Sequence, residues 1–168
     1  MASPKISIIR ATKRGLTLIE VLISIALLTL VGGFSLYFSM DDTRAYSFRD
    51  DRDRIVSVLQ RARAQSMHGV CRPEDCVAAA PHGVYRSGTT IVLFEGTSYA
   101  TRSEAFDEVV ELRSGNLVLS GAEEIIFAPI SGRVTTLPEN EWSIRITDGF
   151  GKSSDITTNA EGRIFWSN

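Results

Sequence analysis

The feature that most constrains this chain is an uninterrupted apolar run near its N-terminus. From Leu16 to Phe38, 23 residues contain no Lys, Arg or Asp and a single Glu. At a rise of about 1.5 Å per residue, a helix of that length is about 35 Å long, which is enough to cross a bilayer with some tilt. A chain of 168 residues is too small to enclose such a helix in its own core. The run therefore predicts a membrane-spanning helix over residues 16–40.

Glu20 is the one charged residue inside this run. A carboxylate within a spanning segment is energetically costly, and such residues commonly carry a function. Two interpretations are open: the side chain snorkels to the headgroups from its place near the end of the span, or it awaits a cationic partner. The first 15 residues contain no acid and four bases, which are Lys5, Arg10, Lys13 and Arg14. This bias places the N-terminus in the cytoplasm and the rest of the chain outside it.

Charge and cysteine content restrict the function further. Without its first 15 residues the chain has 14 basic and 20 acidic residues, and such an acidic protein is a poor candidate for sequence-independent DNA binding. Cys71 and Cys76 lie beyond the predicted span, in a compartment that permits disulfides. A bridge between them is the favoured interpretation, and two reduced buried thiols are the alternative. Because no further ligands accompany the two cysteines, we expect no metal site.

The residues after the apolar run predict an amphipathic helix over residues 41–69. Neither Gly nor Pro occurs between Ser47 and His68, and Gly69 is well placed to end the helix. The charged residues 49–54 are expected to form a solvated face with weak ion pairs. The opposite, apolar stripe should pack on the sheet that follows, and it consists of Ile55, Val56, Val58, Leu59, Ala62, Ser66 and Met67.

Residues 70–168 have the texture of a β-rich domain, in which short apolar segments alternate with turn residues. Nine strands are expected, at residues 82–85, 90–94, 109–112, 116–119, 124–127, 133–136, 143–147, 155–158 and 163–166. The predicted fold class is therefore α+β, with a long N-terminal helix packed on a C-terminal antiparallel sheet. The predicted division of the chain is 1–15, 16–40, 41–69 and 70–168.

No residue constellation in the sequence indicates an enzyme or a cofactor. His68 and His82 are the only histidines, and both are expected at the surface or in turns. None of the motifs of serine hydrolases, zinc proteases or phosphate-binding loops is present. The Gly-rich loop 148–155 offers oxygen atoms to calcium, but its acids lack the EF-hand spacing, and a plain hairpin is expected. Trp142 and Trp166 are interpreted as core or interface aromatics.

The residues around Gly15 resemble the class III signal of type IV pilins and pseudopilins. A basic leader ends in Lys13-Arg14-Gly15, and Leu16 to Leu22 then open the apolar run with Glu20 as their fifth residue. The resemblance implies that a prepilin peptidase cleaves after Gly15 and methylates the new amine of Leu16, and that Glu20 is the assembly glutamate. The family more often has Phe at the first mature position. A secretory signal peptide, the rival interpretation, would have a shorter apolar region and an Ala-x-Ala cleavage site.

Within the run, Gly32-Gly33 permits two interpretations. Paired glycines weaken a helix by about 1 kcal/mol each relative to Ala. They either form a small-residue face for a neighbouring helix or mark a point where the helix unwinds inside a filament. The resemblance to pilins favours local unwinding.

Three downstream segments are similar to GspH/FimT-type minor pseudopilins: residues 59–69, 126–133 and 143–164. This resemblance implies a minor subunit, at or near the tip, of a type II secretion pseudopilus or a type IV pilus. Its partners would be the prepilin peptidase, other pseudopilins or pilins, the inner-membrane assembly platform and, before assembly, membrane lipid. The alternative is a tip adhesin or a DNA-binding minor pilin for DNA uptake. Because acids are interspersed with Arg145, Lys152 and Arg163, the sequence gives the DNA alternative little support.

Overall fold

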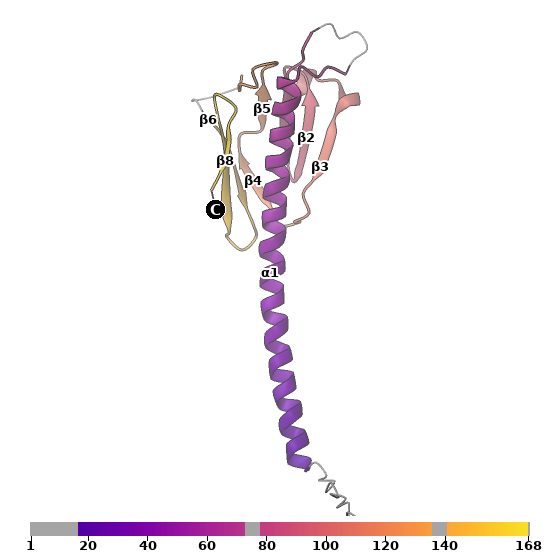
Figure 1. Cartoon of the computed structure of the whole chain (residues 1–168), viewed down its shortest axis with the longest axis vertical. Helices are drawn as coiled ribbons and strands as arrows, with labels where there is room; N and C mark the ends of the chain where they lie inside the picture. Colours follow the sequence, from indigo (N-terminus) through magenta and orange to yellow (C-terminus); the bar gives the residue numbers. More distant parts are fainter. Residues whose placement is uncertain (1–16, 73–77, 136–140, 168) are drawn as a thin grey trace, which may run out of the picture. The chain divides into compact units, whose positions relative to one another are not determined.

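A computed structural model describes residues 17–72, 78–135 and 141–167, without the side chains of residues 35–42. The chain divides into two compact units, Met1–Thr43 and Arg44–Asn168. Helix α1 (Leu18–Met67) runs from the first unit into the second (Figure 1). The elements that follow are β1 (His82–Ser87), β2 (Thr90–Glu95), the 3-10 turns η1 (Tyr99–Thr101) and η2 (Glu104–Phe106), β3 (Glu108–Glu111), β4 (Val118–Gly121), β5 (Glu124–Phe127), β6 (Glu141–Thr147), β7 (Ser153–Asn159) and β8 (Ile164–Trp166).

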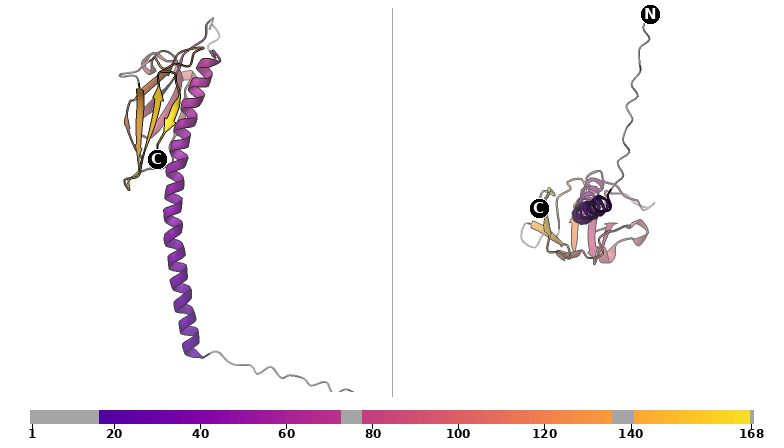
Figure 2. Two further views of the ribbon diagram at one scale, coloured as in Figure 1. Left: turned by 60° about the vertical axis from the view of Figure 1, so that its left-hand side comes forward. Right: turned by 90° about the horizontal axis from the view of Figure 1, so that it is seen from below.

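The strands of the second unit form two antiparallel four-stranded sheets, in the orders β3-β2-β1-β5 and β4-β6-β7-β8. The first is built on the β1–β2 hairpin, in which His82 pairs with Glu95. The second is built on the β6–β7 hairpin, in which Glu141 pairs with Asn159. The C-terminal part of α1 lies beside both sheets, as two views show (Figures 1 and 2). The predicted α+β class with an antiparallel sheet domain is confirmed.

The apolar stripe predicted for the second part of α1 is buried in the shared core. Ile55, Leu59 and Ala62 are almost fully buried and pack with inward side chains of both sheets. Alternation along β6 and β7 supplies the facing residues Ile144, Ile146 and Ile156. Met67 is the exception, because 44% of its surface is exposed at the end of the helix.

The end of α1 is fixed by backbone hydrogen bonds around Gly69, the residue at which the sequence predicted the helix to end. Gly69 has φ +62, its N–H donates to the Ser66 carbonyl (3.1 Å), and the Val70 N–H donates to the Gln65 carbonyl (3.0 Å). These two bonds form a Schellman motif, so the prediction that Gly69 ends the helix is confirmed. A Cβ at Gly69 would lie 3.0 Å from the Cβ of Ala79.

Two polar side chains of α1 tie the helix to the strands from buried positions. The Ser66 hydroxyl donates to the Phe127 carbonyl (3.0 Å) and accepts from the His82 N–H (2.8 Å). The Asp51 carboxylate accepts from the N–H groups of Arg113 (2.8 Å) and Ser114 (3.0 Å). The prediction that residues 49–54 form a solvated face is therefore wrong for Asp51, which is fully buried because it caps this turn, and for Arg52, which is also buried.

The strand expected at residues 133–136 is absent from the part of it that the structure describes, residues 133–135. Only Val134 forms a bridge, to Phe127. The Thr135 N–H donates to the Ile126 carbonyl (2.9 Å), whereas the Val134 N–H donates to the Ala160 carbonyl (3.1 Å). Because consecutive N–H groups serve different segments, no ladder forms here. The other eight expected strands are present, with ends shifted by up to two residues.

Candidate functional site

At the start of α1, the Thr17 side chain caps the helix through the backbone of Glu20. Thr17 precedes the first helical residue, and its hydroxyl oxygen accepts the N–H of Glu20 (3.3 Å). The spacing Thr-x-x-Glu is the sequence signature of this cap, and an acid in the first turn is also favoured by the helix dipole. The sequence analysis missed the role of Thr17, although this spacing could have revealed it. Glu20 thus stabilises the helix start locally and remains exposed.

The described side chains from Leu18 to Phe34 form an apolar surface on all sides of the helix. Eleven large apolar side chains between Leu18 and Phe34 are 43% to 79% exposed: Leu18, Ile19, Val21, Leu22, Ile23, Ile25, Leu27, Leu28, Leu30, Val31 and Phe34. Their spacing leaves no polar stripe that would suit a soluble amphipathic helix. An exposed apolar surface of this extent marks an interaction surface with lipid or protein.

The hydroxyl groups of this segment do not interrupt the apolar surface. The Ser24 hydroxyl donates to the Glu20 carbonyl (2.7 Å), and the Thr29 hydroxyl donates to the Ala26 carbonyl (2.9 Å). Both donors are therefore satisfied within the helix. No Lys, Arg or His occurs between Leu16 and Thr43. A positive partner for the Glu20 carboxylate must accordingly come from outside this segment.

Gly33 lies beside a shallow notch in the same surface. The notch has a volume of about 430 Å³ and is lined by Thr29, Leu30, Gly33 and Phe34. A Cβ added at Gly32 or Gly33 would meet nothing within 4 Å. No packing within the described chain therefore requires these glycines, and both interpretations of the pair remain open.

Several predicted site residues lie outside the described residues. Gly15 and Leu16, the predicted processing site, are among them, and so is Cys76. Cys71 is half-buried, and its predicted bridge to Cys76 stays a prediction. Within the described residues, no helical stretch combines the length and the apolar character that crossing a bilayer requires. The predicted span of residues 16–40 includes residue 16 and the side chains of residues 35–40, which lie outside the described part of the chain, so the span stays a prediction.

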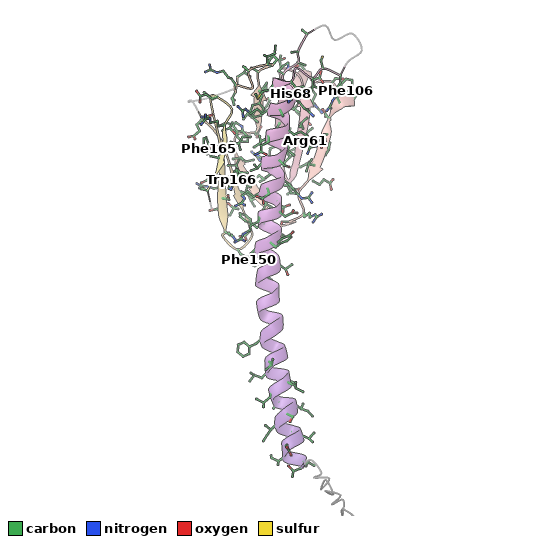
Figure 3. The ribbon with its side chains drawn as sticks, viewed as in Figure 1. Arg61, His68, Phe106, Phe150, Phe165 and Trp166 are labelled. Carbon is green, nitrogen blue, oxygen red and sulfur yellow. The ribbon has the colours of Figure 1, made fainter. Side chains whose placement is uncertain are left out.

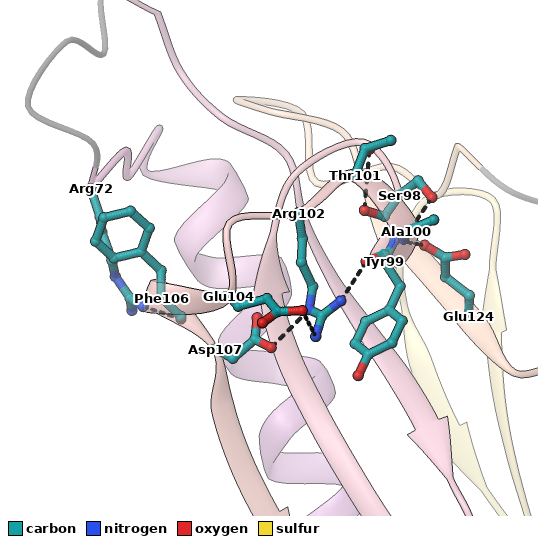
Figure 4. Close-up of polar contacts among 10 residues, drawn as sticks. All are labelled: Arg72, Ser98, Tyr99, Ala100, Thr101, Arg102, Glu104, Phe106, Asp107 and Glu124. Carbon is teal, nitrogen blue, oxygen red and sulfur yellow. Dashed lines mark hydrogen bonds and ion pairs between the residues drawn. The ribbon is translucent and has the colours of Figure 1, made fainter.

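The backbone next to Cys71 is held by the β domain. The Arg72 N–H donates to both carboxylate oxygens of Glu95 (3.2 and 3.3 Å), and its guanidinium donates to the Phe106 carbonyl (3.0 Å) (Figure 4 shows the Arg72–Phe106 contact). The start of the predicted disulfide loop is therefore anchored to β2 and to η2, whatever the state of the thiols.

His82 corrects the expectation of a surface or turn position. It is fully buried in β1, with its Nε2 3.7 Å from the Glu95 carboxylate. Burial lowers the pKa of His82, and the neighbouring Glu95 only partly opposes this effect. The pair is one histidine and one acid, and the described residues contain no group of three or more side chains suited to a metal.

The loop between β2 and β3 contains a compact polar cluster around Arg102 (Figure 4). The guanidinium donates to the Asp107 carboxylate (2.7 Å) and the Tyr99 carbonyl (2.7 Å), and it lies over the Tyr99 ring at 3.6 Å. The hydrogen bond to Asp107 raises the pKa of Arg102. Tyr99 in turn stacks on Tyr85 with ring centroids 3.8 Å apart. These contacts tie the two ends of the loop together through Arg102.

The Gly-rich loop 148–155 is a hairpin whose acids are already occupied. The Asp148 carboxylate accepts from the N–H groups of Phe150 (3.0 Å) and Lys152 (2.8 Å). Asp155 accepts from Arg145 (2.7 and 2.9 Å), and these hydrogen bonds lower the pKa of the Asp155 carboxyl. The plain hairpin is the interpretation that this geometry supports.

The two tryptophans occupy different environments. Trp142 is buried, and its indole N–H donates to the Glu124 carbonyl (3.0 Å). Trp166 is 48% exposed on β8, next to the exposed Phe165 (Figure 3). Trp142 therefore belongs to the core, whereas Trp166 is available at the surface.

Comparison with known proteins bears on the N-terminal segment. No curated protein and no solved structure matched the chain. The matching family model covers residues 10–36, which include Gly15, Glu20 and most of the apolar run. Residues 10–36 thus match the prokaryotic N-terminal methylation motif, which is the signal of type IV pilins and pseudopilins.

Proposed function

We propose that this chain is the precursor of a minor pseudopilin or pilin, a structural subunit of a type II secretion pseudopilus or a type IV pilus. The observation that carries the proposal is the methylation motif at residues 10–36, followed by a helix that is apolar on all sides. In this proposal residues 1–15 are the leader, residues 16–40 the filament-core helix, residues 41–69 its amphipathic continuation and residues 70–168 the periplasmic domain. The resemblance of the downstream segments to GspH/FimT-type subunits supports a place at or near the tip.

Before assembly, the proposed location is the bacterial inner membrane, with the N-terminus cytoplasmic. The apolar side chains between Leu18 and Phe34 are equally suited to lipid and to the side chains of neighbouring helices. Prepilin peptidase cleaves after Gly15, and the Leu16 amine becomes the N-terminus. The leader carries four bases, so an uncleaved chain cannot bring its helix into a dry filament core. Processing therefore permits assembly.

Glu20 has a defined task in this process. In a filament core an unpaired carboxylate costs several kcal/mol. The helix itself offers no cation between Leu16 and Thr43. The processed N-terminal amine, from the same subunit or from its neighbour, supplies the missing charge. The capping bond from the Glu20 N–H to Thr17 orders the first turn, which supports this pairing.

The test is Glu20→Ala, with Glu20→Gln as the isosteric neutral variant, in cells that assemble the filament. Both variants should be processed after Gly15 but should be depleted from sheared or cross-linked filaments by about tenfold or more. The reason is that the positive charge of the Leu16 amine then has no carboxylate partner in the core. Ser24→Ala, one turn further along, is the matched control and should assemble normally. Wild-type incorporation of both Glu20 variants would refute the pairing.

A further inference from the structure

The outer edge of β8 is an open strand edge in the C-terminal sheet. β8 ends the order β4-β6-β7-β8, and among the described strands it pairs with β7 alone. The Asn159 N–H donates to the Arg163 carbonyl (3.1 Å), and the Ser167 N–H donates to the Asp155 carbonyl (2.9 Å). Because antiparallel strands alternate the direction of their backbone groups, those of Ile164 and Trp166 point away from β7. Among the described residues, none forms a hydrogen bond with these groups.

The opposite edge of the same sheet is covered by a side chain. On β4 the carbonyls of Leu119 and Gly121 accept from the Arg86 guanidinium (3.0 and 3.1 Å). Arg86 belongs to β1 of the other sheet, so it occupies the acceptors that an added strand would need. Proteins commonly cover strand edges in this way, because an open edge is a template for another chain.

The edges of the other sheet are covered or acidic. On β5 the carbonyl of Glu124 accepts from the Trp142 indole (3.0 Å), and the carbonyl of Ile126 accepts from the Thr135 N–H (2.9 Å). The β3 edge strand carries Glu108 and Glu111. β8 is thus the edge, among the described strands, that is neither covered nor acidic.

A basic and partly apolar groove borders the β8 edge. It has a volume of about 370 Å³ and lies between α1, which contributes Arg63 and Met67, and β8, which contributes Arg163 and Phe165. Arg63 donates to backbone carbonyls only (3.3 and 3.4 Å). Arg163 forms no ion pair with any described residue. Neither positive charge therefore has a carboxylate partner among the described residues, in a chain that is acidic overall.

β8 carries two exposed aromatic side chains: Phe165 lines this groove, whereas Trp166 points to the other face of the strand, with the Arg52 guanidinium 6.0 Å from its ring centroid. Phe165 is 50% exposed and Trp166 is 48% exposed, and both lie along the strand beside the helix (Figure 3). Exposed aromatic side chains next to arginines are enriched where a protein binds a partner. The edge supplies hydrogen bonds, the arginines supply charge and the aromatic rings supply apolar contact.

We propose that an extended acidic segment of another protein chain adds to β8 as a further strand. Its backbone bonds to the outward N–H and carbonyl groups of Ile164 and Trp166, as in other cases of strand addition. Its carboxylates contact Arg63 and Arg163, and its apolar residues pack on Phe165. A nucleic acid could contact the arginines and the aromatic rings, but it has no peptide backbone to pair with the free strand edge. This inference does not depend on the proposed function.

The experiment titrates the full chain in detergent micelles against short fluorescein-labelled peptides, with anisotropy as the readout. One peptide alternates valine with glutamate, a second alternates valine with lysine, and the third probe is a labelled single-stranded oligothymidine. The glutamate peptide should bind, and tenfold weaker or absent binding is expected for the lysine peptide and the oligonucleotide. Preferential binding of the oligonucleotide, or no binding of the glutamate peptide, would overturn the proposal.

Two pairs of variants then test the mode of binding. Trp166→Pro removes the outward N–H without touching the β7 pairing, and Trp166→Ala removes only the side chain. The proline variant should bind about fivefold more weakly than the alanine variant, which corresponds to one lost hydrogen bond. Arg163→Gln should weaken binding severalfold at low salt, whereas Arg49→Gln, at an exposed position on α1, should not. Equal affinities within either pair would overturn the assignment.

Discussion

The two parts of helix α1 place their apolar side chains in opposite environments, one buried and the other exposed. In the second part, Ile55, Leu59 and Ala62 are buried against the sheets of the same chain. In the first part, Leu18 to Phe34 present apolar side chains of which 43% to 79% is exposed. One part therefore completes the fold of the monomer, and the other requires surroundings that the monomer does not supply. The comparison separates residues that stabilise the domain from residues whose apolar surface is left for lipid or for another chain.

The largest expected difference is between two leucines of the same helix. Leu59→Ala should lower the free energy of unfolding of the β domain by about 3 kcal/mol, because the side chain is fully buried. Leu28→Ala, at a position that is 72% exposed, should change it by less than about 0.5 kcal/mol. Urea unfolding of the full chain in detergent, followed by near-UV circular dichroism, measures both. Similar losses for the two variants would break the comparison.

Two of the acids in the helix, Asp51 and Glu20, should differ in the same sense. Asp51→Ala should cost about 2 kcal/mol of domain stability, because it leaves the buried N–H groups of Arg113 and Ser114 without an acceptor. Glu20→Ala should leave domain stability unchanged while impairing assembly. The same unfolding experiment reports the first effect, and filament incorporation reports the second. An Asp51 variant as stable as the wild type would show that the cap is dispensable.

His82 makes the stability of the second part depend on pH. Burial lowers its pKa below the usual 6.5 in the folded chain, so the unfolded chain takes up the proton first as the pH falls. Its contribution is complete above pH 6.5 and is lost below that value, by at most about 1.4 kcal/mol per pH unit. Unfolding at several pH values should show this slope in wild type and in His68→Gln, but reduced in His82→Phe. An unchanged slope in His82→Phe would contradict the assignment.

Two glycines give the smallest and most instructive contrast. Gly69→Ala should destabilise the domain by about 1 kcal/mol, because φ is +62 and the new Cβ would crowd Ala79. Gly33→Ala should leave the domain unaffected and strengthen the helix locally by about 1 kcal/mol. If local unwinding matters, Gly33→Ala should reduce assembly. If the notch receives a neighbouring helix, Gly33→Leu should reduce assembly, whereas Gly33→Ala should be tolerated.

The sequence predicted the helix, its end at Gly69 and eight of the strands, because periodicity and turn residues are local signals. It failed where distant segments decide the outcome. Asp51 looked like one charge in a solvated run, but residues 113 and 114 bring their N–H groups to it. His82 was expected at the surface or in a turn, but it is fully buried in β1 beside Glu95. Residues 133–136 were predicted to be a strand, but the N–H groups of Val134 and Thr135 bond to two different segments, so no ladder forms there.

The candidate site was predictable to a different degree in its two parts. Gly15, Glu20 and the apolar run lie in one contiguous stretch, so sequence alone could predict the motif that the family model matches at residues 10–36, while the roles of Gly15 and Glu20 stay predictions. The open edge of β8 was not predictable, because it depends on sheet order and on where Arg86 and Trp142 place their donors. Functions carried by a linear motif can be read from sequence, whereas those carried by an edge require the fold.

The most direct test of the central claim is the mass of the protein extracted from membranes of its native host, with the maturation enzyme active. The account predicts a chain that begins at Leu16 and carries a methyl group on its amine. Recovery of the chain with residues 1–15 still attached would contradict it, since the basic leader would then keep the apolar part of α1 out of any filament core.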